Sequence, residues 1–200
     1  MGLPAKKIER RYTYRDLREW PEDERWELID GVAWNMSAAP SVGHQRLVVE
    51  LLRDIAAALD NSPCEILIAP LDVLLPASAE QDMDDVENVV QPDLVVICDQ
   101  AKLVPRGCWG APDWAIEILS PYTSRKDMNE KLALYERHGV REYWIVDPGN
   151  RYIHVYLLGD DGRYPDPSIH VAPATLTSAT CPDLSIDLEE LFARSATEPT

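Results

Sequence analysis

Short apolar segments, separated by Pro, Gly and Asp residues, constrain the fold of this chain more than any other feature of its sequence. Segments of this length are typical of strands, and their nearly continuous apolar character favours the interior of a sheet over an exposed edge. The central part of the chain is therefore predicted to form a buried sheet. The clearest segments are Glu65–Ala69, Val73–Leu75, Asp93–Cys98 and Trp114–Leu119, and further strand candidates are Glu142–Asp147 and Tyr152–Leu158.

A hairpin signal and several helical patterns accompany these strands. Trp26–Met36 contains the turn dipeptide Asp30-Gly31 between two apolar runs, which is typical of a β-hairpin. Ser41 is suited to cap a long helix, and Ser124 opens another in a capping-box arrangement with Asp127. The predicted helices are Tyr14–Trp20, Ser41–Leu59 with the apolar face Val48, Leu51, Leu52, Ile55 and Leu59, Ser124–Gly139, and a short terminal helix at the end of Asp183–Phe192.

A chain of 200 residues is about the size of one domain. Strands interrupted by helices indicate an α/β (α+β) structure, in which helices flank a central mixed β-sheet and the hairpin lies on its N-terminal side. We predict a single domain over residues 12–193, with flexible ends at residues 1–11 and 194–200. The first residues lack the apolar core of a secretory signal and no apolar run approaches the roughly 20 residues that span a bilayer, so we expect a cytoplasmic protein with no membrane partner.

The charge of the chain restricts its partners. Lys and Arg total 19 against 35 Asp and Glu, which gives a formal net charge of −16. The segment from Asp72 to Asp99 contributes eight acidic residues and no Lys or Arg. Such a field repels polyanions at long range, which excludes non-specific coating of nucleic acid. Any contact with DNA is expected to be weak, or to be assisted by a partner.

The four cysteines form no Cys-x-x-Cys pair. In a chain without a secretory signal, this spacing indicates reduced, mostly buried thiols that act as small apolar residues. The same spacing gives no support to a zinc site. The cysteines are Cys64, Cys98, Cys108 and Cys181.

Two acidic residues occupy positions where an acid is costly: Asp93 begins an apolar run and Glu117 lies in the middle of another. An unpaired buried carboxylate costs several kcal/mol, so a compensating cation is expected. One interpretation is a Mg²⁺ or Mn²⁺ ion held by these acids and the carbonyl oxygen of Ile118, with Lys131 nearby to orient a water molecule. The other interpretation is a structural ion pair between the acids and Lys131 or an arginine.

His44 and Glu27 leave similar alternatives open. His44 precedes Val48 by one helical turn and points toward the same side, where it is either a site residue or a hydrogen-bonded interior histidine. Glu27 lies between the apolar residues Trp26 and Leu28, and it is either a site residue or part of the hairpin surface.

These residues resemble the Uma-type putative restriction endonucleases, a family of the PD-(D/E)xK nuclease superfamily. The resemblance covers roughly Tyr12 to Phe192, with the elements in the order of that family. It rests on Trp26-Glu27-Leu28-Ile29-Asp30-Gly31, His44, Pro92-Asp93, Glu117-Ile118-Leu119-Ser120-Pro121, Lys131, Tyr135, Glu142-Tyr143-Trp144-Ile145-Val146-Asp147-Pro148 and Pro182-Asp183-Leu184-Ser185-Ile186.

The resemblance implies a restriction-endonuclease-like core and assigns the two metal-binding acids to Asp93 and Glu117. Leu119 stands where the superfamily has its lysine, and in the Uma-type pattern Lys131 of the following helix supplies that group instead. Glu27 and His44 are implied as additional pocket residues, Glu27 as a candidate ligand of a second metal and His44 as a candidate contact to water or phosphate.

The predicted function is accordingly a Mg²⁺-dependent endonuclease, with Mn²⁺ as a substitute, that hydrolyses DNA phosphodiester bonds. Two alternatives accompany it: a catalytically silent protein that binds nucleic acid or serves in assembly, and a metal-dependent hydrolase of small phosphate esters. Because enzymes that cut both strands commonly pair two sites by two-fold symmetry, we also expect a homodimer.

Overall fold

The computed structural model describes residues 6–7, 10–36, 39–121 and 124–196. The predicted flexible ends fall partly outside these ranges. Ser124, which the sequence predicts to open the second helix as its cap, is the first residue within that helix. Within the described ranges, no helix is both long enough and apolar enough to cross a membrane.

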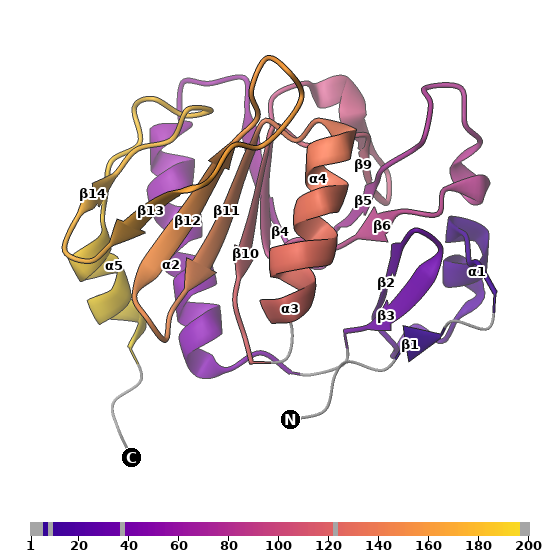
Figure 1. Ribbon diagram of the computed structural model, residues 1–200, viewed down its shortest axis with the longest axis horizontal. Coiled ribbons are helices and arrows are strands. Elements are labelled where there is room, and N and C mark those ends of the chain that lie inside the picture. The colour runs from indigo at the N-terminus through magenta and orange to yellow at the C-terminus, as the bar shows by residue number, and fades with distance from the viewer. Residues whose placement is uncertain (1–5, 8–9, 37–38, 122–123, 197–200) are drawn as a thin grey trace.

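A six-stranded mixed sheet forms the centre of the molecule (Figure 1). β10 and β11 are parallel, and the other neighbouring strands of this sheet are antiparallel. This arrangement confirms the predicted fold class. The strands, in their order across the sheet, are β13 (Ser168–Val171), β12 (Tyr152–Leu157), β11 (Glu142–Asp147), β10 (Trp114–Ile118), β7 (Leu94–Ile97) and β4 (Glu65–Ile68).

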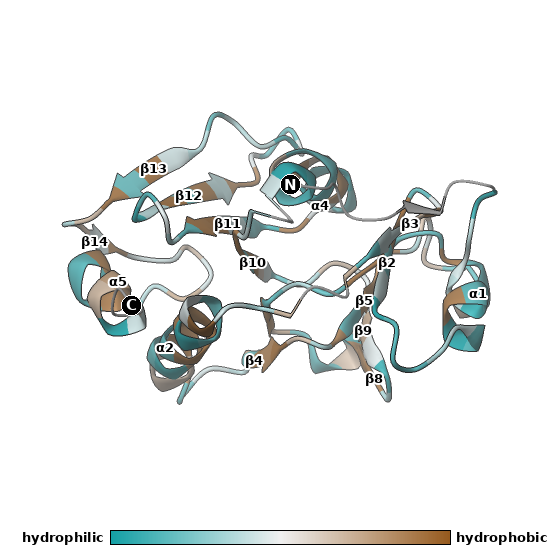
Figure 2. Ribbon diagram, turned by 90° about the horizontal axis from the view of Figure 1, so that it is seen from below, coloured by the Kyte–Doolittle hydropathy of each residue, from teal (hydrophilic) through white to brown (hydrophobic). Residues whose placement is uncertain are grey.

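Helices cover both faces of this sheet, α2 (Val42–Ala58) and α5 (Leu188–Ser195) on one side and α4 (Leu132–His138) on the other (Figure 2). Ser41 caps α2 as predicted, because its hydroxyl accepts a hydrogen bond from the amide of His44 at 3.1 Å. The apolar face of α2 is buried against the sheet, with Leu47, Leu51 and Ile55 wholly inaccessible to solvent. Burial of this face gives the helix most of its stability.

The helical segment before β11 departs from the regular helix that the sequence predicts. It begins as α3 (Ser124–Lys126), continues through a π-helical turn at Asp127–Lys131 and ends as α4. Gly139 terminates it in the left-handed conformation, with φ of +80°, as its sequence position predicts. The i→i+5 bonding of a π turn brings residues five apart to the same side, which a regular α-helix does not.

A second sheet lies beside the first and contains the predicted hairpin (Figure 1). The hairpin turns at Asp30 and Gly31, which both have positive φ, as a two-residue hairpin loop requires. The strands, in order, are β1 (Lys6–Lys7), β3 (Val32–Asn35), β2 (Trp26–Ile29), β6 (Val89–Val90), β5 (Asp72–Leu74), β9 (Gly107–Trp109) and β8 (Leu103–Val104). The remaining elements are α1 (Tyr14–Glu19), the 3₁₀ turns Met83–Asp85 and Gln100–Lys102, and the strand pair β14 (Thr175–Leu176) and β15 (Ile186–Asp187).

Two expectations are wrong. The Glu65–Ala69 segment does not lie in the interior of a sheet. It forms β4, which is an edge strand, and Ile68 within it is 43% exposed to solvent. Cys64 and Cys98 are not reduced, because they form a disulfide directly beyond the paired residues Glu65 and Ile97. The other two cysteines are free and buried, as predicted.

Candidate active site

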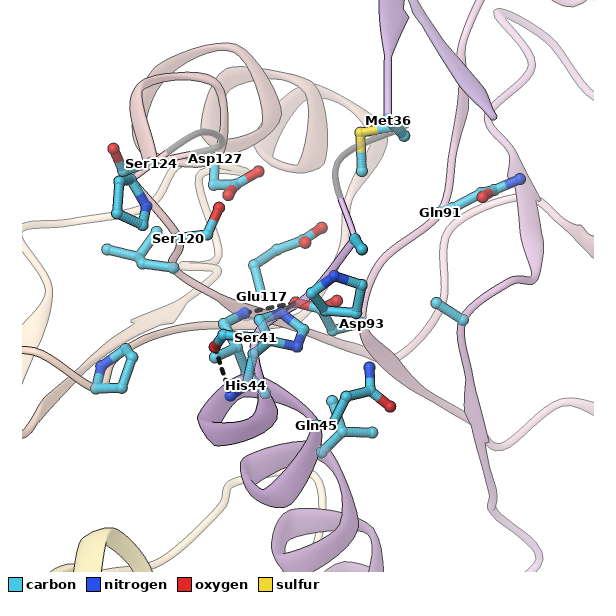
Figure 3. A pocket seen from close by; sticks show the side chains of 18 of the residues that line it. Met36, Ser41, His44, Gln45, Gln91, Asp93, Glu117, Ser120, Ser124 and Asp127 are labelled. Carbon is cyan, nitrogen blue, oxygen red and sulfur yellow. Dashed lines mark hydrogen bonds and ion pairs between the residues drawn. The ribbon is translucent and has the colours of Figure 1, made fainter. Parts of the chain in front are cut away.

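A cavity of about 770 Å³ lies where the ends of β10 and β11 meet the first turn of α2 and the start of α3 (Figure 3). Its lining combines apolar side chains with acidic and hydrogen-bonding ones, which is typical of a ligand site. The polar and charged lining residues are Arg25, Asn35, Ser41, His44, Gln45, Gln91, Asp93, Glu117, Ser120, Ser124, Asp127 and Asp147.

Asp93 directly precedes β7, and two hydrogen bonds to its Oδ2 hold the side chain in place. His44 Nε2 lies 3.2 Å from this oxygen, and the amide of Ile118 donates to it at 2.8 Å. Burial opposes the charged form of His44, but the hydrogen bond and the charge of Asp93 outweigh it and raise the pKa of the imidazole. His44 is thus a partner of Asp93 at the cavity, and the helical turn capped by Ser41 holds it there.

Glu117 extends from β10 and is almost wholly buried. Its Oε1 accepts hydrogen bonds from Lys131 Nζ at 2.6 Å and from the Tyr135 hydroxyl at 3.0 Å. Burial raises the pKa of this carboxyl group well above its ordinary value, and the neighbouring acids add to the effect against the opposing charge of Lys131. The position therefore favours an additional cation.

Glu27, on β2, crosses from the second sheet to the helix that covers the first. Its Oε1 lies 2.7 Å from Lys131 Nζ, and its Oε2 pairs with Lys126 Nζ. All three side chains are shielded from solvent. Burial acts to raise the pKa of Glu27, but the two ammonium groups overcome it and lower the pKa to about 2. Glu27 is therefore a counterion for both lysines.

The π turn explains how one carboxylate meets two lysines. Lys126 and Lys131 are five residues apart, so a regular α-helix would direct them to different sides. The π turn between them aligns both ammonium groups with Glu27. Asp127, within the same turn, is also buried and approaches Lys131 at 3.9 Å. In the described part of the chain, the buried cluster thus combines the acids Glu27, Glu117 and Asp127 with the lysines Lys126 and Lys131.

The donor atoms at the cavity fit a hard divalent cation. Among the described residues, both hydrogen bonds to Glu117 fall on Oε1 and both to Asp93 fall on Oδ2, which leaves one oxygen of each carboxylate for another ligand. Oxygen donors suit Mg²⁺ and Mn²⁺, and Mg²⁺ retains several waters. No group of three or more His, Cys, Asp or Glu side chains in the described part of the chain is arranged to hold a metal. Two carboxylates completed by main-chain oxygen and water are the arrangement that fits.

The structure brings the predicted residues Asp93, Glu117 and Lys131 together, but not all of the predicted site residues line the cavity. Asp93, Glu117, His44 and Ile118 line the cavity, whereas Lys131 and Glu27 lie behind Glu117, outside the lining. Lys131 therefore meets Glu117 in the ion pair that the sequence left open as an alternative.

Lys126, Asp127 and Gln91 belong to the site or its support, and sequence reasoning did not assign them roles there. Lys126 is a basic residue within a predicted helix, and nothing in its local sequence indicates that it is buried. The one available signal is the spacing of five between Lys126 and Lys131, and it becomes meaningful only if the helix contains a π turn. Gln91 precedes the Pro92-Asp93 pair and is one of the residues that line the cavity.

A sheet that carries paired acids at its strand ends, beside a cavity, agrees with a nuclease fold. The model of the Uma2 family, described as putative restriction endonuclease, matches residues 13–189. The chain belongs to this family.

One curated protein is similar to this chain in sequence, and one solved structure is similar to it in fold. An uncharacterized protein, slr1290, from Synechocystis sp. is 27% identical over 149 residues, which cover 73% of this chain and 74% of the relative. The crystal structure of a putative nuclease belonging to DUF820 from Anabaena variabilis is similar in fold, with a TM-score of 0.74 and 19% identity over 92% of this chain and 99% of the other.

Proposed function

We propose that the protein is a metal-dependent endonuclease that hydrolyses DNA phosphodiester bonds at the cavity. The observation that carries the proposal is the juxtaposition of Asp93, directly before β7, and Glu117, on the neighbouring strand β10; one oxygen of each carboxylate accepts no hydrogen bond from the residues that the structure describes. The family of putative restriction endonucleases supports the reaction class and DNA as the substrate.

Contacts within the protein hold the two acids and the imidazole of His44 in place. Asp93 and Glu117, with the carbonyl oxygen of Ile118, would hold a Mg²⁺ or Mn²⁺ ion, which supplies Lewis acidity toward a phosphate and acidifies a bound water. His44 Nε2 orients Asp93 from the helix side, and the ring lies at the cavity, where it can contact a phosphate or a water. Lys131 orients Glu117 from behind the cavity rather than by reaching into it.

Plasmid cleavage tests the proposal. Purified protein with Mg²⁺ or Mn²⁺ is expected to nick plasmid DNA, and Asp93→Asn or Glu117→Gln to reduce the rate at least about a hundredfold, because Lewis-acid stabilisation is worth several kcal/mol. Glu189→Gln removes an exposed acid of α5 and serves as the control. Full activity of both site variants would refute this site, provided that their thermal unfolding matches the parent.

Two further measurements separate the alternatives. Calorimetric titration with Mn²⁺ is expected to give heat that Asp93→Asn abolishes. DNA binding without that heat or any cleavage would favour the catalytically silent alternative. Hydrolysis of a small chromogenic phosphodiester, without plasmid cleavage, would favour the small-ester hydrolase.

A further inference from the structure

Arg25 occupies a fixed position on the cavity wall. It lies directly before β2, and its carbonyl oxygen accepts the amide of Met36 at 2.7 Å, which ties it to the end of the hairpin. Among the described residues, it is the only lysine or arginine that lines the cavity. One permanently charged basic side chain of the described residues therefore faces a lining that carries several acids.

A neutral amide, rather than an acid, holds the guanidinium group. Arg25 Nε and Nη2 both donate to Gln91 Oε1, at 3.2 and 2.8 Å. Gln91 Nε2 in turn donates to Asp72 Oδ1 at 2.8 Å, which turns the amide oxygen toward the arginine. The Gln91 main-chain amide donates to Glu27 Oε1 at 2.8 Å. Gln91, two residues before Asp93, thus orients the arginine, and within the described ranges no carboxylate forms an ion pair with it.

Most arginines of this acidic chain form ion pairs with carboxylates instead. Within the described ranges, the arginines in ion pairs with carboxylates are Arg10, Arg11, Arg15, Arg18, Arg53, Arg137, Arg151, Arg163 and Arg194. With 35 acids against 19 basic residues, a carboxylate partner is readily found. An arginine held at a cavity by an amide remains available to an anion from outside, and a guanidinium can bind phosphate through paired hydrogen bonds.

We propose that Arg25 binds a backbone phosphate of the substrate and positions the polyanion in the cavity against Asp93 and Glu117. This role rests on the proposed function. The net charge of −16 repels a polyanion, and Arg25 supplies the local positive charge that binds it. Arg25 is a binding residue in this scheme, and the chemistry stays with the acids.

Two kinds of measurement on the full chain test the role. In plasmid cleavage with Mn²⁺, Arg25→Gln is expected to raise KM about tenfold or more with a smaller change in kcat, and Arg25→Lys to restore part of the loss. In DNA binding without divalent metal, Arg25→Gln is expected to lower the slope of log affinity against log salt by about 0.9, the contribution of one phosphate contact.

Arg141→Gln is the matched control. It makes the same change of charge at an exposed arginine directly before β11, whereas the cavity borders the other end of that strand. If Arg25→Gln and Arg141→Gln change KM and the salt slope equally, the role of Arg25 is refuted while the nuclease proposal stands. If the parent neither binds nor cleaves DNA, both proposals fall. A loss confined to kcat, or one that Arg25→Lys does not relieve, would also refute the phosphate-binding role.

Discussion

Glu27 is a fully buried carboxylate that carries two buried ammonium groups. Breaking a buried ion pair by removing one partner is far more costly than losing an exposed pair, because the remaining charge has lost its solvent and its counterion. Arg151 and Glu189 form a pair about half exposed, and solvent screens their attraction. A buried and an exposed ion pair therefore contribute differently to the stability of this molecule.

Glu27→Gln is expected to lower the free energy of unfolding by about 3–5 kcal/mol, because it leaves Lys126 and Lys131 short of negative charge. Urea denaturation at neutral pH measures the loss. Glu189→Gln, the exposed counterpart, is expected to change stability by no more than about 1 kcal/mol. Equal losses in the two variants would contradict a special role for Glu27.

The same residue predicts sensitivity to acid. The folded-state pKa of Glu27, about 2, lies below its ordinary value of 4.5. Its contribution to stability is therefore present above pH 4.5 and is lost as the pH falls toward 2. The expected loss is of the order of 3 kcal/mol across that window, from about 1.4 kcal/mol per pH unit of pKa difference. Urea midpoints measured at several pH values should fall more steeply in the parent than in Glu27→Gln, and parallel curves would contradict this assignment.

The π turn at Asp127–Lys131 is the element on which the charge cluster depends. It contains one residue more than a regular helix would need to connect α3 to α4. Inserting one further residue into this turn would place Lys126 and Lys131 six residues apart, a spacing at which a regular helix directs the two side chains about 120° away from each other. Only one of the two lysines could then face Glu27.

Insertion of one alanine after Asn129, an exposed residue of this turn, is expected to destabilise the protein by about 3–5 kcal/mol and to abolish cleavage, because it separates Lys126 from Glu27. Urea denaturation and plasmid cleavage measure both effects. Asn129→Ala, which keeps the chain length, is the control and is expected to stay within about 1 kcal/mol of the parent. An insertion variant as stable as this control would show that the spacing of the two lysines is dispensable.

Elements specified by local signals could be predicted, and those specified by distant contacts could not. The hairpin follows from Asp30-Gly31, and the start of α2 follows from Ser41, because each signal acts within a few residues. The Cys64–Cys98 disulfide depends on strand pairing across 34 residues of sequence, which no local pattern reports. At the site, the two costly acids could be predicted, whereas the burial of Lys126 depends on an irregular helix.

At the scale of the whole molecule, the net charge of −16 opposes association with DNA and with a second copy alike. Screening by salt weakens repulsion between like-charged chains, so a homodimer of this protein should become more populated as the ionic strength rises. The contact between Arg25 and phosphate should show the reverse dependence. Salt therefore separates the two kinds of association.

The predicted homodimer can be measured by sedimentation at low and high salt. The expected result is a species of twice the 22.6 kDa chain mass, whose fraction rises with salt. Arg25→Gln serves as the control, because it should alter DNA binding and leave the sedimentation unchanged. A single species of the chain mass under all conditions would contradict the prediction.

The attachment of Glu27 to both lysines also has a mechanical consequence. The Glu27 carboxylate belongs to the second sheet, and the two ammonium groups belong to the helix that packs on the first sheet. A hinge motion between the sheets would therefore have to separate oppositely charged groups that are buried from solvent. Arg25 precedes Glu27 by two residues and is carried by the same rigid joint. The aperture between the arginine and the paired acids should therefore keep its width when a nucleic acid enters, which leaves the nucleic acid to adjust its own shape.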